Sequence, residues 1–184
     1  MDLLKFNELM ALKKKPWQEI DEWRHYLEFC FGYFQSRGIS NPMVVELGIA
    51  SNRQKRFYKE LLNADHIGID INPRRVPDIL ADTHSKEAKK QLLRTLEGRT
   101  IDLLYIDAGH LYKDAKMDLE IFGPMSRHLV ALHDVCHCDP KRPEVQVKKL
   151  WDEVLQLSGN SRWLTKITIN AKPNHMGIGI LTKN

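Results

Sequence analysis

The sequence alternates short apolar runs with helical stretches, and this alternation constrains the fold more than any other feature. The apolar runs, which we expect to be strands, lie at 43–47, 66–71, 78–80, 101–106 and 128–133. The stretches between them, which we expect to be helices, lie at 53–63, 85–97, 112–122 and 144–158. Such a rhythm predicts βαβ units and a mostly parallel sheet.

Two last apolar runs, 163–169 and 176–182, break the pattern because only the six residues NAKPNH separate them. A parallel crossover needs about a dozen residues or more, so these runs should form an antiparallel hairpin. The sequence therefore predicts an α/β fold, a Rossmann-like doubly wound sheet of about seven strands, mostly parallel with an antiparallel last strand. This is the arrangement of class I methyltransferases rather than of dinucleotide-binding domains.

A length of 184 residues suits one domain. We expect a single domain over 1–184, with an N-terminal helical segment at 1–38 and a Rossmann-like core at 43–182. Apolar residues between 16 and 37 recur at three- and four-residue steps, which predicts an amphipathic helix. Its aromatic side chains could pack in the core or form an interface in a homo-oligomer.

Bulk properties argue against a membrane protein and against a nucleic-acid partner. Hydrophobic residues make up 42% of the chain, and no apolar run approaches the roughly 20 residues of a membrane span. The odd count of three cysteines suits a reducing compartment, and the N-terminus does not resemble a secretory signal, so we expect a cytoplasmic protein. The net charge of +4 comes from interleaved acidic and basic residues, which is not the footprint of nucleic-acid binding.

The first strand ends in a turn that could hold a cofactor, since open α/β sheets bind ligands beyond the carboxyl ends of their strands. A dinucleotide fingerprint would place glycines where this chain has Glu46, Gly48 and Ser51, so NAD is disfavoured. Glu46 before the turn glycine Gly48, followed by Ala50 and Asn52, instead suits a cofactor with a cationic amino-acid tail. Asn52 tolerates the left-handed conformation that glycine usually supplies. The alternative is an ordinary strand-to-helix turn.

The next two strand ends offer groups for an adenosine. Asp70 lies 22 residues beyond Gly48, where a carboxylate can accept hydrogen bonds from both ribose hydroxyls. The third strand is followed by Asp82 and Thr83, and Asp82 could accept a hydrogen bond from an adenine amino group. A helix cap is the alternative role for Asp82.

The fourth and fifth strand ends carry acids and imidazoles that should lie side by side. Asp107, His133 and Asp134 could converge on a divalent metal, since carboxylates favour magnesium and an imidazole suits manganese or iron. His110 is the natural general base for a hydroxyl proton near neutral pH. In the alternative interpretations, Asp107 only orients the cofactor ammonium and His133 is a hydrogen-bonded histidine at the strand end.

The segment 133–139 concentrates two cysteines, two histidines and two acids, which could suggest zinc. Structural zinc sites usually draw pairs of ligands from separated segments, and this chain has no second cluster. We therefore interpret the segment as a loop on the substrate side of the site.

Together these strand ends resemble the small O-methyltransferase family that includes the macrocin O-methyltransferases and the related cephalosporin hydroxylase group. The likeness covers 43–182, and its stretches are VVELGIAS, IGIDINP, DILADTHSKE, IDLLYIDAGHLYKDAKMDLEIFGPM and LVALHDV. The resemblance implies S-adenosylmethionine as cofactor, a magnesium site that includes Asp107 and Asp134, and His110 as the proposed base. The chain departs from the family pattern at Asn52, where a second glycine is frequent, and at His133, where glutamate is common.

The residues and the resemblance together predict metal-assisted O-methylation of a small-molecule hydroxyl. Three alternatives stay open: a non-catalytic protein of this fold that binds an adenosine ligand or a partner, a nucleic-acid methyltransferase, and a chemistry of the hydroxylase branch other than methyl transfer. Amino-methylating nucleic-acid enzymes commonly carry an Asn/Asp-Pro-Pro-aromatic segment after the fourth strand, whereas IDAGHLY has no proline.

Overall fold

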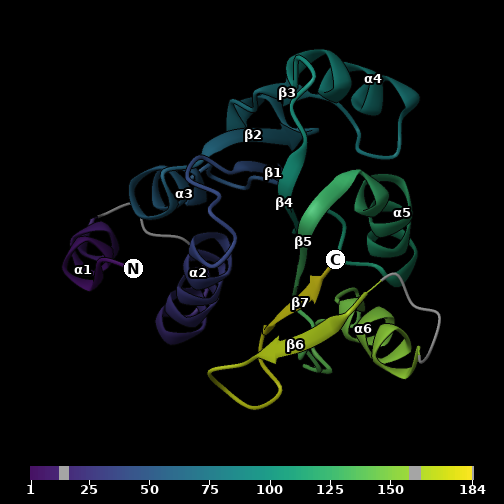
Figure 1. Ribbon diagram of the computed structural model, residues 1–184. Coiled ribbons are helices and arrows are strands. Elements are labelled where there is room, and N and C mark those ends of the chain that lie inside the picture. Colours follow the sequence, from purple (N-terminus) through teal and green to yellow (C-terminus); the bar gives the residue numbers. More distant parts are fainter. Residues whose placement is uncertain (13–16, 158–162, 184) are drawn as a thin grey trace.

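The computed structural model describes residues 1–12, 17–157 and 163–183, which form a seven-stranded sheet covered by helices on both faces (Figure 1). The order along the sheet is β3-β2-β1-β4-β5-β7-β6. The strands are β1 Met43–Leu47, β2 Asp65–Asp70, β3 Ile79–Leu80, β4 Ile101–Ile106, β5 Ser126–His133, β6 Thr165–Ile169 and β7 Ile178–Thr182. The α-helices are α1 Leu3–Ala11, α2 Ile20–Gln35, α3 Gln54–Leu62, α4 Lys86–Thr95, α5 Tyr112–Phe122 and α6 Val147–Gln156.

The strand directions confirm the predicted topology. The first five strands pair in parallel, whereas β7 is antiparallel to both of its neighbours, β5 and β6. The short loop between the last two strands leaves no room for a crossover, so the chain must turn back on itself. The last strand is therefore the reversed one, as the sequence predicts.

Two apolar clusters hold the helices against opposite faces of the sheet. The first cluster contains α1, α2 and α3, and the second contains α4, α5 and α6. Trp23 of α2 lies at the centre of the first cluster, where its ring makes edge contacts with Tyr58 and Tyr105 at centroid distances of 5.7 and 6.0 Å. Three aromatic residues of α2 are buried and pack in the core: Trp23, Tyr26 and Phe34. Trp17, which precedes the helix, is 67% exposed.

Element boundaries agree closely with the sequence patterns. The predicted strands 43–47 and 101–106 and the predicted helix 112–122 match without any shift, and Ser85 caps α4 by accepting a hydrogen bond from the Ala88 N–H. The helix predicted over 16–37 begins at Ile20, and its predicted start at Pro16 lies outside the described residues, as does position 158 at the end of the helix predicted over 144–158. The helix α1 is an element that the sequence analysis did not separate from the rest of the N-terminal segment.

No helix among the described residues is both long and apolar enough to cross a bilayer. The three cysteines are all free. The neighbours β1 and β4 are where the strand order reverses direction, because β2 follows β1 on one side and β5 follows β4 on the other. Ligands of doubly wound sheets bind at the carboxyl ends of the strands at such a point, which is where the candidate site lies.

Candidate active site

A cavity of about 470 Å³ opens at the carboxyl ends of the strands around this reversal point. Its walls come from the turns after β1, β2, β3 and β4. Seven of the residues named from sequence lie along it: Gly48, Ala50, Asp70, Asp82, Thr83, Asp107 and His110. These groups come from four separate strand ends, so the fold alone brings them to one cavity.

The turn after β1 is built from left-handed residues. Gly48 has φ +79°, and a Cβ atom there would overlap the Asp107 carbonyl oxygen, so only glycine lets the two strand ends approach. Ala50 and Asn52 also have positive φ, at 45° and 54°. The structure thus confirms that Asn52 takes the conformation that glycine usually supplies, although its side chain does not line the cavity.

Asp70 and the loop after β3 form the far wall of the cavity. The Asp70 carboxylate accepts hydrogen bonds from the backbone N–H groups of Ile49 at 3.1 Å and Asn72 at 2.8 Å, which fixes it against the turn after β1. Asp82 accepts a hydrogen bond from the His84 N–H at 3.0 Å. Because Ser85 caps α4, the alternative role of Asp82 as that cap is excluded.

Glu46 lies apart from the cavity. Its carboxylate is fully buried and lies 2.8 Å from the His66 ring nitrogen Nε2. Burial raises the pKa of Glu46, while the hydrogen bond with His66 opposes this rise. Glu46 therefore shapes the turn from behind rather than contacting what the cavity holds.

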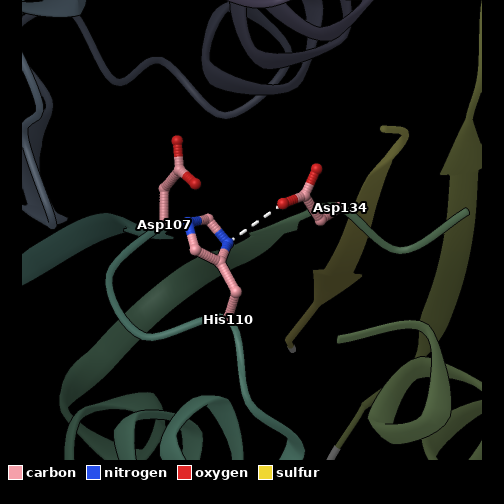
Figure 2. Close-up of side chains that lie close together, drawn as sticks. All are labelled: Asp107, His110 and Asp134. Carbon is pink, nitrogen blue, oxygen red and sulfur yellow. Dashed lines mark ion pairs between the residues drawn. The ribbon is translucent and has the colours of Figure 1, made fainter. Parts of the chain in front are cut away.

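Three side chains from the ends of β4 and β5 meet at the rim of the cavity (Figure 2). One ligand-capable atom from each of Asp107, His110 and Asp134 lies within 4.8 Å of the other two. The His110 nitrogen Nδ1 lies 3.0 Å from an Asp134 carboxylate oxygen, and this hydrogen bond raises the pKa of His110. Asp134 has φ +60°, an uncommon conformation for a residue other than glycine, which turns its side chain out of the strand direction.

His133 lies outside this set of three, although the sequence named it as a metal ligand in place of His110. Its Nδ1 lies 3.2 Å from Asp107 Oδ1 and 3.5 Å from Asp134 Oδ1, and its Nε2 lies 3.8 Å from Glu22 Oε1. Burial alone would lower the pKa of His133, but the negative charges of these three carboxylates raise it to about 9. His133 is thus a buried imidazole surrounded by acids.

Comparison with solved structures shows what this arrangement is similar to. MycE, the methyltransferase from the mycinamycin biosynthetic pathway solved with Mg, SAH and mycinamycin VI, has a TM-score of 0.68 at 14% identity, and the match covers 100% of this chain and 54% of MycE. TomG of Streptomyces achromogenes, an O-methyltransferase involved in tomaymycin synthesis and solved with SAM, has a TM-score of 0.52 at 15% identity over 99% of this chain and 89% of TomG. An rRNA methylase from Streptococcus thermophilus has a TM-score of 0.58 at 13% identity over 94% and 99% of the two chains.

The chain has the class I methyltransferase fold. No protein-family model matches its sequence, and no curated protein matches it either. The chain spans about half the length of MycE. Since the three similar structures include an enzyme of the mycinamycin biosynthetic pathway and an rRNA methylase, the methyltransferase fold by itself does not select an acceptor.

Two residues of the N-terminal segment also belong to this site, and the sequence analysis did not name them. Gln18 is buried and its Nε2 lies 3.4 Å from Asp107 Oδ2. Glu22 of α2 is fully buried and accepts a hydrogen bond from the Gly177 N–H at 3.0 Å, and burial raises its pKa to about 7. The sequence around a polar residue in an amphipathic segment does not show which part of the fold the residue will contact. The sequence pattern therefore did not predict that Gln18 and Glu22 belong to the site.

The segment 133–139 pairs with the turn before β7, since the Cys136 N–H donates to the Met176 carbonyl at 2.7 Å and the Cys138 N–H to the Asn174 carbonyl at 3.4 Å. Among residues 1–12, 17–157 and 163–183, no cysteine belongs to a cluster that could hold a metal.

Proposed function

We propose that the chain transfers the methyl group of S-adenosylmethionine to a hydroxyl oxygen of a small molecule. The observation that carries this proposal is the imidazole of His110, oriented by Asp134 at the rim of the strand-end cavity. A hydroxyl must lose its proton as its oxygen attacks the methyl carbon, so O-methylation needs a base at this place.

The cavity fits the cofactor in its chemistry. Asp70 offers carboxylate oxygens for the ribose hydroxyls, and Asp82 and Thr83 line the end that would hold the adenine. Gly48 lets the turn after β1 lie directly against the Asp107 backbone, and Ala50 and Asn52 continue the same turn. The volume of about 470 Å³ falls within the range of pockets that hold molecules of this size.

The proton moves along a short path. The Asp134 carboxylate holds His110 through Nδ1, which leaves Nε2 as the nitrogen that accepts the hydroxyl proton. The acceptor oxygen then forms a bond to the methyl carbon as the bond to sulfur breaks, and the sulfonium loses its charge. The products are a methyl ether, S-adenosylhomocysteine and protonated His110. Positioning of the two reactants accounts for much of the expected rate enhancement.

A divalent cation, with magnesium the first candidate, fits the same carboxylates. Asp107 and Asp134 would supply oxygen ligands. His133, whose Nδ1 lies 3.2 and 3.5 Å from these two carboxylates, would join them as a ligand only after losing its proton, which would leave His110 for the hydroxyl proton. A bound cation would lower the pKa of the acceptor hydroxyl. MycE was solved with Mg, which supports this part of the proposal.

Two rival functions make different predictions. A non-catalytic binding protein would take up the cofactor or an analogue without any transfer, and a nucleic-acid methyltransferase would transfer to an RNA or DNA acceptor. The paired His110 and Asp134 favour a hydroxyl acceptor over a non-catalytic role and over methylation of a base nitrogen, because neither of these requires a dedicated base of this kind. The interleaved surface charges and the free thiols are in line with a cytoplasmic enzyme of small molecules.

Calorimetric titration tests the proposal at its first step. Titration of the chain with S-adenosylmethionine, with and without magnesium, should show one site per chain under at least one of the two conditions. Absence of binding under both conditions would overturn the proposed function. If the cofactor binds and a panel of hydroxyl-bearing small molecules yields labelled methyl ether, the rival of a non-catalytic binder is excluded.

A further inference from the structure

Gln18 holds an unusual position for a polar side chain. It lies just before α2, it is only 4% exposed, and its side chain contacts two residues at the end of β4. Its Nε2 lies 3.4 Å from both the Tyr105 hydroxyl and Asp107 Oδ2. A carboxylate can only accept, so the amide NH₂ must face Asp107, and this fixes the direction of the other amide atom.

That other atom, Gln18 Oε1, is buried and has no hydrogen-bond partner among the residues that the structure describes. An unpaired buried amide oxygen has lost its hydrogen bonds to water without gaining others, so native structures rarely keep one without a reason. The turn after β1 has two more such atoms, Ser51 Oγ and Asn52 Oδ1. Trp17 connects the two segments, since its ring lies 5.8 Å from the Arg53 guanidinium.

The unpaired atoms are oxygens, and oxygens of this kind accept hydrogen bonds. The group that would satisfy them must therefore bring donors. An ammonium group supplies three N–H donors and no acceptor, so it complements such a set. It would also carry a positive charge into a region already lined by Asp107.

The positions of the residues that line the cavity indicate which part of the cofactor would lie nearest to Gln18. With adenine at Asp82 and ribose at Asp70, the amino-acid tail of S-adenosylmethionine must extend toward Gly48 and Asp107. Gly48 packs directly on the Asp107 backbone, and Gln18 lies on the Asp107 side chain. The end of the cofactor that carries the ammonium group thus points at the region of the unpaired oxygens.

We propose that Gln18 is a cofactor-binding residue whose amide oxygen accepts a hydrogen bond from the ammonium group of S-adenosylmethionine, while its NH₂ group holds Asp107. The N-terminal segment then completes the cofactor site rather than only covering the sheet. This inference rests on the proposed function, since it takes S-adenosylmethionine to be the ligand of the cavity.

The test compares two ligands that differ in the tail. 5′-Methylthioadenosine keeps the adenosine and the sulfur atom, as an uncharged thioether in place of the sulfonium, but lacks the amino-acid tail. In calorimetric titrations, Gln18→Met should weaken binding of S-adenosylmethionine about tenfold, because a charge-assisted hydrogen bond is lost. Binding of 5′-methylthioadenosine should change by less than about twofold. The exposed Gln35, at the other end of α2, gives the matched control Gln35→Met, which should change neither affinity.

The titrations distinguish a failure of the role of Gln18 from a failure of the proposed function. Equal weakening of both ligands by Gln18→Met, or no weakening of S-adenosylmethionine, would overturn the role of Gln18. If the wild-type chain binds neither ligand, the proposed function fails and the inference fails with it.

If Gln18→Met does not fold, the side-chain amide resonance of Gln18 in the wild-type chain provides the readout by nuclear magnetic resonance. It should shift when S-adenosylmethionine is added and stay in place with 5′-methylthioadenosine. Equal shifts with both ligands would contradict the proposal.

Discussion

The His110 nitrogen Nδ1 lies 3.0 Å from the Asp134 carboxylate, which joins the loop after β4 to the end of β5. A carboxylate at this distance selects the tautomer of the imidazole and fixes its plane, so that Nε2 faces the cavity rim. Gln146 also stabilises the loop after β4, since its backbone N–H donates a hydrogen bond to the His110 carbonyl at 2.7 Å. His110 is thus held through its side chain by Asp134 and through its backbone by Gln146.

Removing either member of this pair should reduce methyl transfer without removing the cofactor. We expect His110→Gln to lower the turnover number by about 10²- to 10⁴-fold, because the hydroxyl proton then has no acceptor. Asp134→Asn should also lower it, since the imidazole loses its orienting charge. The affinity for S-adenosylmethionine, measured by calorimetry on both variants, should stay within about twofold. Full turnover in His110→Gln would rule out this residue as the base.

Because the turn after β1 lies so close to β4, one added methyl group at Gly48 should strongly reduce the stability of the fold. Gly48→Ala places a Cβ against the Asp107 backbone and should destabilise the fold by about 2 to 4 kcal/mol, as measured by urea unfolding. Gly98 has a similar φ of +85° with open space around it, so Gly98→Ala isolates the backbone strain and should cost only about 1 to 2 kcal/mol. Equal losses of stability in the two variants would show that the approach at Gly48 is not tight.

Asp70 should control cofactor affinity. Asp70→Asn removes the charge that would hold the ribose hydroxyls, so we expect binding of S-adenosylmethionine to weaken by about 10- to 100-fold. The exposed Asp65 at the start of the same strand is the matched control, and Asp65→Asn should leave the affinity unchanged. Unaltered affinity in Asp70→Asn would place the ribose elsewhere.

The buried carboxyl of Asp118 should make the free energy of unfolding depend on pH. This carboxyl of α5 is fully buried, and burial raises its pKa from 3.8 to about 6, against the opposing charge of His84 and with the support of Asp114 and Asp82. A raised carboxyl pKa means that the fold prefers the protonated form, so its stabilising effect is complete below pH 3.8 and is lost as the pH rises through about 6.

Asp118→Asn removes this titration. The variant should therefore gain about 1 to 3 kcal/mol relative to the wild type when the pH is raised from about 4 to about 8, measured by urea unfolding at each pH. A difference between variant and wild type that is the same at both pH values would contradict the assignment.

The sequence predicted the sheet well because strand and helix periodicities are local signals. The reversal of β7 followed from loop length alone, and the wall of the cavity followed from the rule that strand ends bind ligands. The helix α1 was missed although Asp2 caps its start, because it ends at its C-cap Leu12 without the glycine or asparagine that usually marks a helix stop.

The details of the site depended on side-chain directions that the sequence does not reveal. Glu46 does not line the cavity, and its carboxylate pairs with the His66 ring instead. His133 and His110 are both close to Asp107 and Asp134 in space, and only the folded chain shows which imidazole shares the compact set with the two aspartates. Gln18 reaches Asp107 across 89 residues of sequence, a contact for which no motif exists.

The most direct test of the whole account is a crystal structure of the chain grown with S-adenosylhomocysteine. The account predicts the ribose hydroxyls on the Asp70 carboxylate, the adenine beside Asp82 and Thr83, and the sulfur near Asp107 and His110. Binding of the nucleoside in a different place, or an orientation that puts its adenine at His110, would contradict it.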